Sequence, residues 1–194
     1  ISALARYFLS EGWKVTGLEY SDFACGKFNA HLLKNLIIGN IDNSIIDLIT
    51  KGKKFDVILL ANVLEHVIDP LNLLKQIKLL AADNAILIIE VPNDYSVLHK
   101  YLLEKKIINE EFWVALPDHL SYFNKDGLIN VAKDAGWNCK FVMADNPLEF
   151  NLLNPNTNYI KDKSKWKSCH LTRIAIDNLL HSISVEKTVE YYQS

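Results

Sequence analysis

The fold follows from the stretch Phe55-Asp56-Val57-Ile58-Leu59-Leu60-Ala61-Asn62-Val63-Leu64-Glu65-His66-Val67. Its unbroken apolar run over 57–61 has strand length and is typical of a parallel strand that is buried on both faces. Asp69-Pro70 then predicts the start of a helix, with Asp at the N-cap and Pro in the first turn. Apolar residues at 71, 74, 77 and 80 give that helix one apolar face. The stretch therefore predicts a strand, a short polar connection and a helix.

The same alternation continues on both sides of this stretch. Ala85–Val91 predicts a second buried strand, and shorter strands are expected at Trp13–Leu18 and Leu36–Ile38. Helices are expected over 2–11, 22–33, 45–49 and 124–135. Strands that alternate with helices over short connections are the pattern of βαβ units. We therefore expect an α/β, Rossmann-like, doubly wound fold with a mostly parallel sheet, flanking helices and a C-terminal helical segment.

The remaining segments are less regular. Residues from about 95 to 117 are mixed and aromatic, which indicates a lid or insertion, and Trp137–Met143 predicts one more strand. Residues 145–167 are rich in Asn, Pro, Lys and Asp and indicate a loop or an edge hairpin. Amphipathic helices follow at 171–181 and 185–192. We expect a domain over residues 1–153, followed by a loop and C-terminal helices over 154–194.

Composition narrows the functional classes. The 194 residues carry a formal net charge of -2, so no basic field favours nucleic acid as a partner. No apolar run approaches the roughly 20 residues that span a bilayer, so no membrane span is expected. The three cysteines, Cys25, Cys139 and Cys169, lie far apart, and their odd number argues against a disulfide framework. We expect a cytoplasmic protein with reduced thiols.

Ligands of open α/β sheets collect at the carboxyl ends of the strands. Four places follow an apolar strand in this way: Glu19-Tyr20, Asn40 to Asp42, Ala61 to Glu65, and Pro92-Asn93. A carboxylate placed like Glu19 can accept hydrogen bonds from both hydroxyls of a ribose. Its position does not separate an NAD ribose from an adenosylmethionine ribose, or either from a solvated strand end.

Two motifs resemble one known family. Val63-Leu64-Glu65-His66-Val67-Ile68-Asp69-Pro70, after Phe55-Asp56-Val57-Ile58, looks like the segment after the fourth strand of class I S-adenosylmethionine-dependent methyltransferases. It is most typical of their ubiquinone-biosynthesis-like and polysaccharide-modifying branches. Asp118-His119-Leu120-Ser121-Tyr122-Phe123, with Ala135-Gly136-Trp137 further on, is similar to the HLxxF segment of the family. The resemblance extends over roughly residues 1–144.

The resemblance implies S-adenosylmethionine as the cofactor and S-adenosylhomocysteine as the product. It implies Glu19 for the ribose hydroxyls, with Tyr20 beside it. Asn40-Ile41-Asp42 would meet the adenine ring, with either Asn40 or Asp42 as the acceptor for its amino group and Ile41 against its face. Ala61 and Asn62 would border the methionine end of the cofactor.

The glycine-rich GxGxG loop of the family is not in this sequence. In the family this loop precedes the first helix, and the chain opens at Ile1 inside a helical pattern. We expect the loop to precede Ile1. The other reading is a Rossmann-like domain that lost its cofactor loop and binds without catalysis.

Methyl transfer to a hydroxyl needs a group that accepts a proton, and His suits this role near neutral pH. His119 is the first candidate base, and the alternative is that it fixes the lid through a backbone hydrogen bond. His66 is a weaker candidate, because Glu65 and His66 also suit the start of a helix. No metal site is expected, since the other histidines, His31, His99, His170 and His181, show no metal-ligand spacing.

The acceptor is expected to be a small molecule. Residues 170–192 resemble the C-terminal helices of methyltransferases of surface-polysaccharide and nucleotide-sugar pathways, which favours a sugar or nucleotide-sugar acceptor. A quinone or phenol O-methyltransferase is the second choice, because the aromatic residues Phe112, Trp113, Tyr122 and Phe123 suit either class. The same helices would close the sheet or form a homodimer contact.

One further motif suggests a different enzyme. Tyr101 and Lys105 match the YxxxK pattern of short-chain dehydrogenases, but apolar residues occupy the place of the serine that this chemistry needs. Tyr and Lys at this spacing on a helix are common by chance, so we do not favour a dehydrogenase.

Overall fold

The structure is a computed structural model that describes residues 2–193. Its contacts divide the chain into two compact units. Unit 1 comprises the residues up to Leu64 together with Leu71–Glu90, and unit 2 comprises Glu65–Pro70 and the residues from Val91 onward. Ile1, where the sequence begins, lies outside the described residues.

Unit 1 holds the α/β part of the chain. Its elements, in order, are α1 (Ser2–Ser10), β1 (Gly17–Glu19), α2 (Phe23–Asn29), the 3-10 helix η1 (Ala30–Asn35), β2 (Leu36–Ile38), α3 (Ile41–Thr50), β3 (Phe55–Ala61), α4 (Pro70–Leu80) and β4 (Ala81–Glu90). A second 3-10 helix, η2 (Leu64–His66), spans the boundary between the units.

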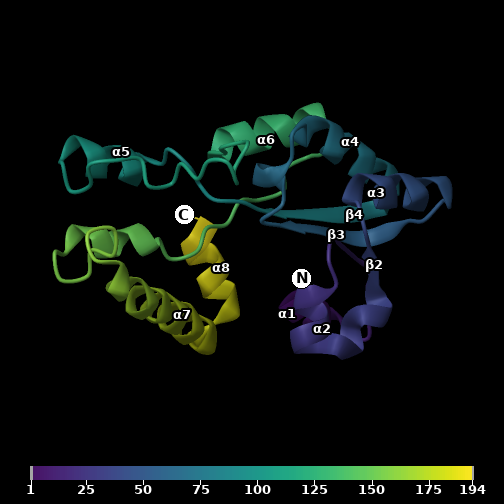
Figure 1. Ribbon diagram of the computed structural model, residues 1–194, viewed down its shortest axis with the longest axis horizontal. Coiled ribbons are helices and arrows are strands. Elements are labelled where there is room, and N and C mark those ends of the chain that lie inside the picture. Colours follow the sequence, from purple (N-terminus) through teal and green to yellow (C-terminus); the bar gives the residue numbers. More distant parts are fainter. Residues whose placement is uncertain (1, 194) are drawn as a thin grey trace. The chain divides into compact units, whose positions relative to one another are not determined.

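The strands of unit 1 form two parallel pairs, β1 with β2 and β3 with β4. Each pair is joined by a connection that contains a helix, as a βαβ unit requires. Figure 1 shows the β3–β4 pair with α3 and α4 drawn along it. The expected α/β, Rossmann-like fold with parallel strands and C-terminal helices is confirmed.

Helix α4 begins at Pro70, as Asp69-Pro70 predicted. Its apolar face carries the fully buried Leu74 and the nearly buried Leu73 and Ile77, which are at most 5% exposed. In β3, which was predicted to be buried on both faces, Leu60 is buried, Asp56 is exposed and the other residues are half-buried. The prediction that the second strand is buried is wrong for β4. Its burial alternates along the strand, and Ile86 is 59% exposed. An alternating pattern means that only one face of this strand is covered.

Two other elements of unit 1 differ from the expectation. The predicted strand over 13–18 shrinks to Gly17–Glu19, because only these residues pair with Leu36–Ile38. The helix expected over 22–33 ends at Asn29 and continues as the 3-10 helix η1. Ala5 of α1, Cys25 of α2 and Leu32 of η1 form a small buried cluster in this part of unit 1.

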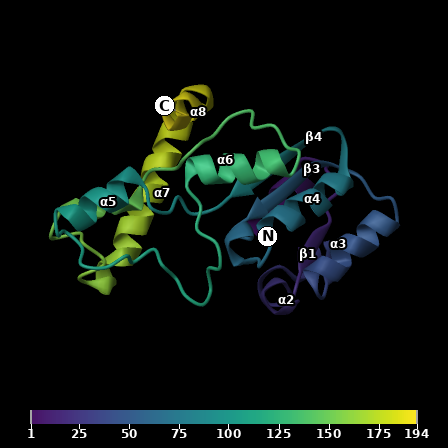
Figure 2. The ribbon, with the colours of Figure 1, turned by 90° about the horizontal axis from the view of Figure 1, so that it is seen from above.

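Unit 2 is mostly helical. Its elements are α5 (Val97–Glu104), α6 (Lys125–Asp134), the 3-10 helices η3 (Leu148–Leu153) and η4 (Lys163–Lys165), α7 (Trp166–Ile183) and α8 (Val185–Gln193). Figure 2 shows the long helix α7 and the shorter α8 that follows it after a break at Ser184. Both helices agree with the prediction, although α7 begins five residues earlier than expected.

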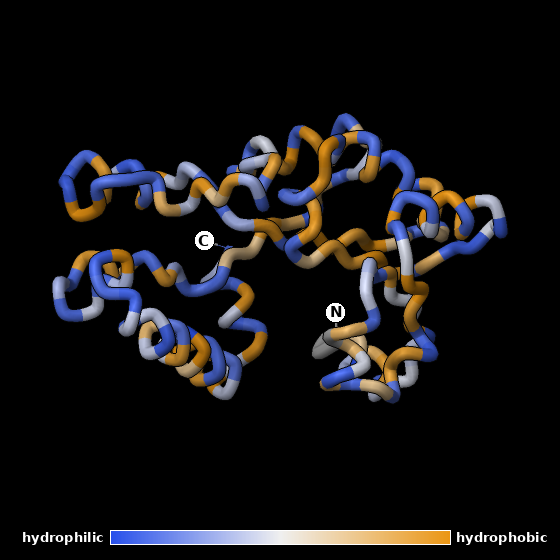
Figure 3. The backbone as a smooth tube through the Cα atoms, in the orientation of Figure 1, coloured by the Kyte–Doolittle hydropathy of each residue, from blue (hydrophilic) through white to orange (hydrophobic). Residues whose placement is uncertain are grey.

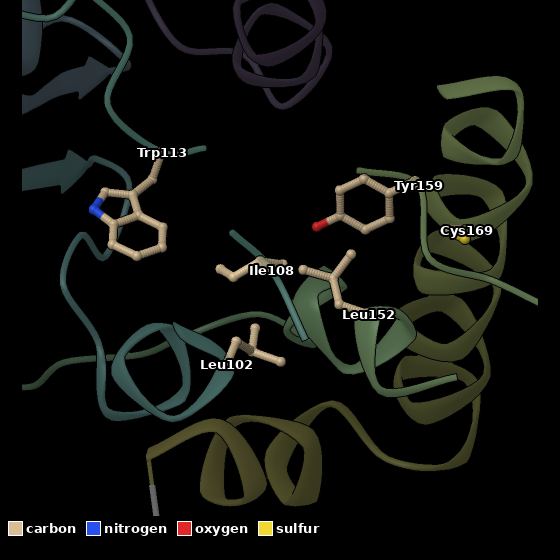
Figure 4. Packing of buried hydrophobic residues seen from close by; sticks show 6 residues of the cluster. All are labelled: Leu102, Ile108, Trp113, Leu152, Tyr159 and Cys169. Carbon is tan, nitrogen blue, oxygen red and sulfur yellow. The ribbon is translucent and has the colours of Figure 1, made fainter. Parts of the chain in front are cut away.

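The core of unit 2 joins α5, η3 and α7. Leu102, Ile108 and Leu152 are at most 2% exposed and lie at its centre, with Trp113, Tyr159 and Cys169 around them. In Figure 4 the ring of Tyr159 points toward Ile108. The mixed segment after residue 95 is therefore a packed part of this unit, since it supplies three residues of the core.

The strand predicted for unit 2 is wrong. Trp137–Met143 belongs to neither of the sheets found among residues 2–193, and residues 138–141 are exposed. Of the two alternatives for residues 145–167, the structure agrees with the loop, which contains two 3-10 helices, and not with the edge hairpin. Apolar and β-branched composition favours a strand, but a strand also needs a partner with unpaired backbone groups.

Helix α7 keeps apolar residues on its surface. Leu171, Leu179 and Ile183 are each more than half exposed. Figure 3 shows orange and blue alternating along this helix, as an amphipathic sequence requires. Among the described residues, no helix is both long and apolar enough to cross a membrane.

Candidate functional site

The carboxyl ends of β1 and β2 bring two predicted positions together. The amide of Gly39 donates a 2.9 Å hydrogen bond to the carbonyl oxygen of Glu19, and Glu19 is in register with Ile38. Asn40, which begins the next turn, is therefore held close to Glu19. Glu19 is half-buried, whereas the neighbouring Tyr20 is 63% exposed.

Asn40 is the N-cap of α3. Its side-chain oxygen accepts a 3.0 Å hydrogen bond from the amide of Asn43, which satisfies one of the unpaired donors of the first turn. Ile41 is half-buried and Asp42 is exposed in that turn. The three residues thus form the polar start of a helix directly after a strand.

The end of β3 carries the other pair of predicted cofactor residues. Ala61 is in register with Glu90 of β4, and the amide of Asn62 donates a 2.9 Å hydrogen bond to the carbonyl oxygen of Glu90. Asn62 has a φ of +50°, in the left-handed region that Asn tolerates better than most residues. This turn ends the strand and leaves the Asn62 side chain exposed.

Glu65 and His66, three and four residues after Asn62, form hydrogen bonds with a distant segment of unit 2. The carbonyl oxygen of Glu65 accepts hydrogen bonds from the amides of Leu120 (2.8 Å) and Ser121 (3.1 Å). The Nδ1 atom of His66 lies 2.7 Å from the carbonyl oxygen of Asp118. Three hydrogen bonds therefore fix the backbone on both sides of His119.

His119 is half-buried beside His66. The two imidazole rings are T-shaped, with centroids 4.9 Å apart, and the ring of Tyr122 lies 6.1 Å from that of His119. The buried Nδ1 atom of His119 has no hydrogen-bond partner among the described residues. Glu65 is 1% exposed, and its Oε2 atom is also buried without a partner there.

A group that the sequence did not single out lies near these residues. Asp94 is 1% exposed and accepts a 3.3 Å hydrogen bond from the amide of Phe123 through Oδ2. Burial raises the pKa of Asp94, although the hydrogen bond from Phe123 and the proximity of His119 and His99 act in the opposite direction. Asp94 directly follows Pro92-Asn93, one of the four strand ends that the sequence analysis marked. Extending that strand end by one residue would have included Asp94.

A second buried group surrounds His99. Its ring stacks on Trp113 with centroids 4.2 Å apart, and its Nε2 atom lies 3.5 Å from Oε1 of Glu149. Trp113 and Phe123 are no more than 8% exposed. These two rings pack inside unit 2, while Tyr122 remains half-buried and Tyr95 is 38% exposed.

The predicted residues therefore fall into three groups. Glu19 and Tyr20 lie beside Asn40–Asp42, Ala61 and Asn62 end β3, and His66 contacts His119. The dehydrogenase-like pair belongs to none of them, because Tyr101 is 46% exposed on α5 and lies under the Nζ atom of Lys105 at 5.7 Å. This contact explains the pair as a surface cation–π interaction.

The comparisons with known proteins cover the part of the chain that contains both resembling motifs. A family model described as a methyltransferase domain matches residues 3–140. No curated protein matches the chain significantly. The matched residues are more than half of the chain and include all three groups above, so this chain belongs to the methyltransferase-domain family.

Proposed function

We propose that the chain is an S-adenosylmethionine-dependent methyltransferase that acts on a small molecule. The observation that carries the proposal is the methyltransferase-domain match over residues 3–140. That range includes every residue proposed here for the cofactor and both candidate histidines.

Glu19 is proposed to bind the ribose of the cofactor, with Tyr20 beside it. Its carboxylate offers two acceptor oxygens for two neighbouring hydroxyls. Its place at the end of β1, beside the start of α3, supports this role.

Asp42 is proposed to accept a hydrogen bond from the amino group of the adenine, with Ile41 packed against the ring. Asn40 was the alternative acceptor, but its side-chain oxygen already caps α3. Ala61 and Asn62 are proposed to border the methionine end, because a small residue and an exposed amide at a strand end leave room for a charged ligand.

The sulfonium of the cofactor is an activated leaving group, so the protein has mainly to hold the acceptor in line and take up a proton. His119 is proposed to receive the proton, since its half-buried ring retains a nitrogen without a partner among the described residues. His66 is a weaker candidate, because its Nδ1 atom is engaged by Asp118.

We propose a sugar or nucleotide-sugar as the acceptor. Tyr95 and Tyr122 have ring centroids 6.3 Å apart, and Tyr122 adjoins His119. Exposed aromatic faces of this kind pack against sugar rings and planar rings alike, so a quinone or phenol is the alternative acceptor. A cytoplasmic location, and a homodimer through α7 and α8, stay predictions.

Calorimetric titration with S-adenosylhomocysteine tests the cofactor assignment. The protein is expressed together with any residues that precede Ile1 in its gene. Glu19→Gln removes the charge that would accept the ribose hydroxyls, and we expect the Kd to rise by about 10- to 100-fold, as for the loss of a charged hydrogen bond. Glu11→Gln, at an exposed position of unit 1, is the matched control and leaves the Kd unchanged.

If the unmodified protein does not bind S-adenosylhomocysteine, the result would instead favour the second candidate, a domain that binds another ligand and is not catalytic.

If S-adenosylhomocysteine does bind, transfer of a labelled methyl group to nucleotide sugars, quinone precursors and simple phenols identifies the acceptor class. Loss of transfer in His119→Gln, with unchanged binding of S-adenosylhomocysteine, is the result expected for a group that acts on the acceptor.

A further inference from the structure

Three side chains of types that commonly bind metals lie close together in unit 2, although the two histidines among them, His66 and His119, are 53 positions apart in sequence. Glu65, His66 and His119 each offer one ligand atom, and these atoms all lie within 4.8 Å of one another. The carboxylate Oε1 of Glu65 is 3.8 Å from Nε2 of His66. A tetrahedral zinc ion with bonds of about 2.0 Å separates its ligand atoms by roughly 3.3 Å, so small side-chain movements complete the site.

The orientation of His66 suits a ligand. A carbonyl oxygen can only accept a hydrogen bond, so the Nδ1 atom of His66 carries the hydrogen that it shares with Asp118 at 2.7 Å. In the neutral ring the lone pair then lies on Nε2, the atom nearer to Glu65. Histidines that bind metals are commonly oriented in this way by a backbone carbonyl behind the ring.

The unpartnered atoms give an independent indication. Glu65 is 1% exposed, and its Oε2 atom has no hydrogen-bond partner among the described residues. The buried Nδ1 atom of His119 likewise has no hydrogen-bond partner among the described residues. A buried carboxylate without compensation is costly, and a bound cation removes that cost.

We infer that Glu65, His66 and His119 bind one divalent transition-metal ion. Two imidazoles and one carboxylate are ligands for zinc or a neighbouring metal, whereas magnesium and calcium prefer oxygen atoms alone. Three protein ligands leave a coordination position open for water or for an oxygen of a bound molecule.

This site goes beyond the proposed function, and binding of the ion does not depend on methyl transfer. Only the role of the ion in the reaction rests on the proposed function. With the ion bound, His119 is a ligand and no longer the base. The ion would lower the pKa of a coordinated hydroxyl of the acceptor, and the proton released from it would pass to water.

Titration of the metal-free protein with zinc chloride and with cobalt(II) chloride tests the inference. The full chain is first dialysed against a chelator, and no cofactor is added. We expect one ion per chain, with a visible cobalt spectrum of nitrogen and oxygen ligands. His66→Gln and His119→Gln should each weaken zinc binding at least about tenfold, because each removes one of three ligands.

Two controls exclude other ligands. His181→Gln changes an exposed histidine of α7, and Cys139→Ser removes the exposed thiol, which could bind zinc by itself. Both should leave the stoichiometry and the Kd unchanged. His66 has an exposed side chain, 44% accessible, so its substitution should not unfold the protein, and circular dichroism verifies this.

Absence of zinc binding, or zinc binding that is unchanged in His66→Gln and His119→Gln, overturns the inference. Binding of S-adenosylhomocysteine is measured separately on the same metal-free sample. A protein that binds the nucleoside product but no ion retains the proposed function and loses only the metal site.

Discussion

Two hydrogen bonds join Asp94 and Phe123 in the interior of unit 2. The amide of Asp94 donates to the carbonyl oxygen of Phe123 at 2.7 Å, and the amide of Phe123 donates to Oδ2 of Asp94 at 3.3 Å. Both residues are buried. The first bond belongs to the backbone alone, whereas the second depends on the side chain of Asp94.

Asp94→Ala should therefore destabilise the protein. It leaves the buried amide of Phe123 without its acceptor, and we expect the free energy of unfolding to fall by about 1–3 kcal/mol. Urea denaturation near neutral pH measures this change. Asp94→Asn keeps an acceptor oxygen and should lose less, so equal losses in the two variants would show that the hydrogen bond is not the cause.

The raised pKa of Asp94 predicts a pH dependence of stability. Burial raises this pKa above 3.8, so between 3.8 and the raised value the native protein binds more protons than the unfolded chain. Stability then falls as the pH rises through this window. Asp94→Asn lacks this loss, so its stability relative to the unmodified protein should increase from about pH 4 upward and become constant above the raised pKa. A difference that stays flat or decreases over this range contradicts the assignment.

Glu149 should show the opposite dependence. Burial acts to raise its pKa, but the hydrogen bond with His99, the hydrogen bond from the backbone of Glu149 and the charges of His99 and Arg173 together outweigh burial, and the pKa of Glu149 lies below 4.5. The stability that this pair contributes is present above 4.5 and is lost as the pH falls through the lowered pKa. Glu149→Gln should thus be less stable than the unmodified protein near neutral pH, with a gap that narrows in acid. Glu104→Gln, at the exposed end of α5, serves as the control and should show no such trend.

The core of unit 2 should be sensitive to the loss of a single side chain. Leu102 is fully buried in the cluster with Ile108 and Leu152. Leu102→Ala should lower the free energy of unfolding by about 2–5 kcal/mol, because it leaves a cavity that the neighbours fill only in part. Val97→Ala, on the same helix but 86% exposed, should change it by less than about 0.5 kcal/mol. Comparable losses in the two variants would place the core elsewhere.

The turn after β3 depends on a residue that accepts a positive φ. Asn62 has a φ of +50°, where a β-carbon is unfavourable. Asn62→Ala should destabilise the protein by about 1 kcal/mol, while Asn62→Gly should be neutral or stabilising. Thermal denaturation of the two variants decides the point, and a Gly variant less stable than the Ala variant would indicate that the side chain matters more than the backbone.

The local parts of this structure could be predicted from the sequence. The apolar run of β3 and the Asp69-Pro70 start of α4 are local signals, and both elements form where they were expected. The strand predicted at Trp137–Met143 is wrong because strand pairing is not local, and neither of the two sheets among the described residues includes this segment. The burial of β4 fails for the same reason, since the sequence cannot tell which face is covered.

The candidate site shows the same limit. The two histidines were recognised one at a time, from motifs that are read along the chain. Their contact with each other and with the buried Glu65 depends on hydrogen bonds between backbone segments that are far apart in sequence. Asp94 lies one residue beyond the marked strand end Pro92-Asn93, and its burial and its hydrogen bond with Phe123 depend on a contact that is not local in sequence.

The segment from Asp118 to Phe123 is held at both ends, by Glu65 and His66 at one and by Asp94 at the other. An insertion or deletion inside it would break this registration, so its length should be invariant among homologous proteins. Residues 95–114 lie between Asp94 and this segment in the chain. Within that stretch, Leu102, Ile108 and Trp113 are tied to the core of unit 2, so variation among homologues should be confined to its exposed positions, while the histidine keeps its place.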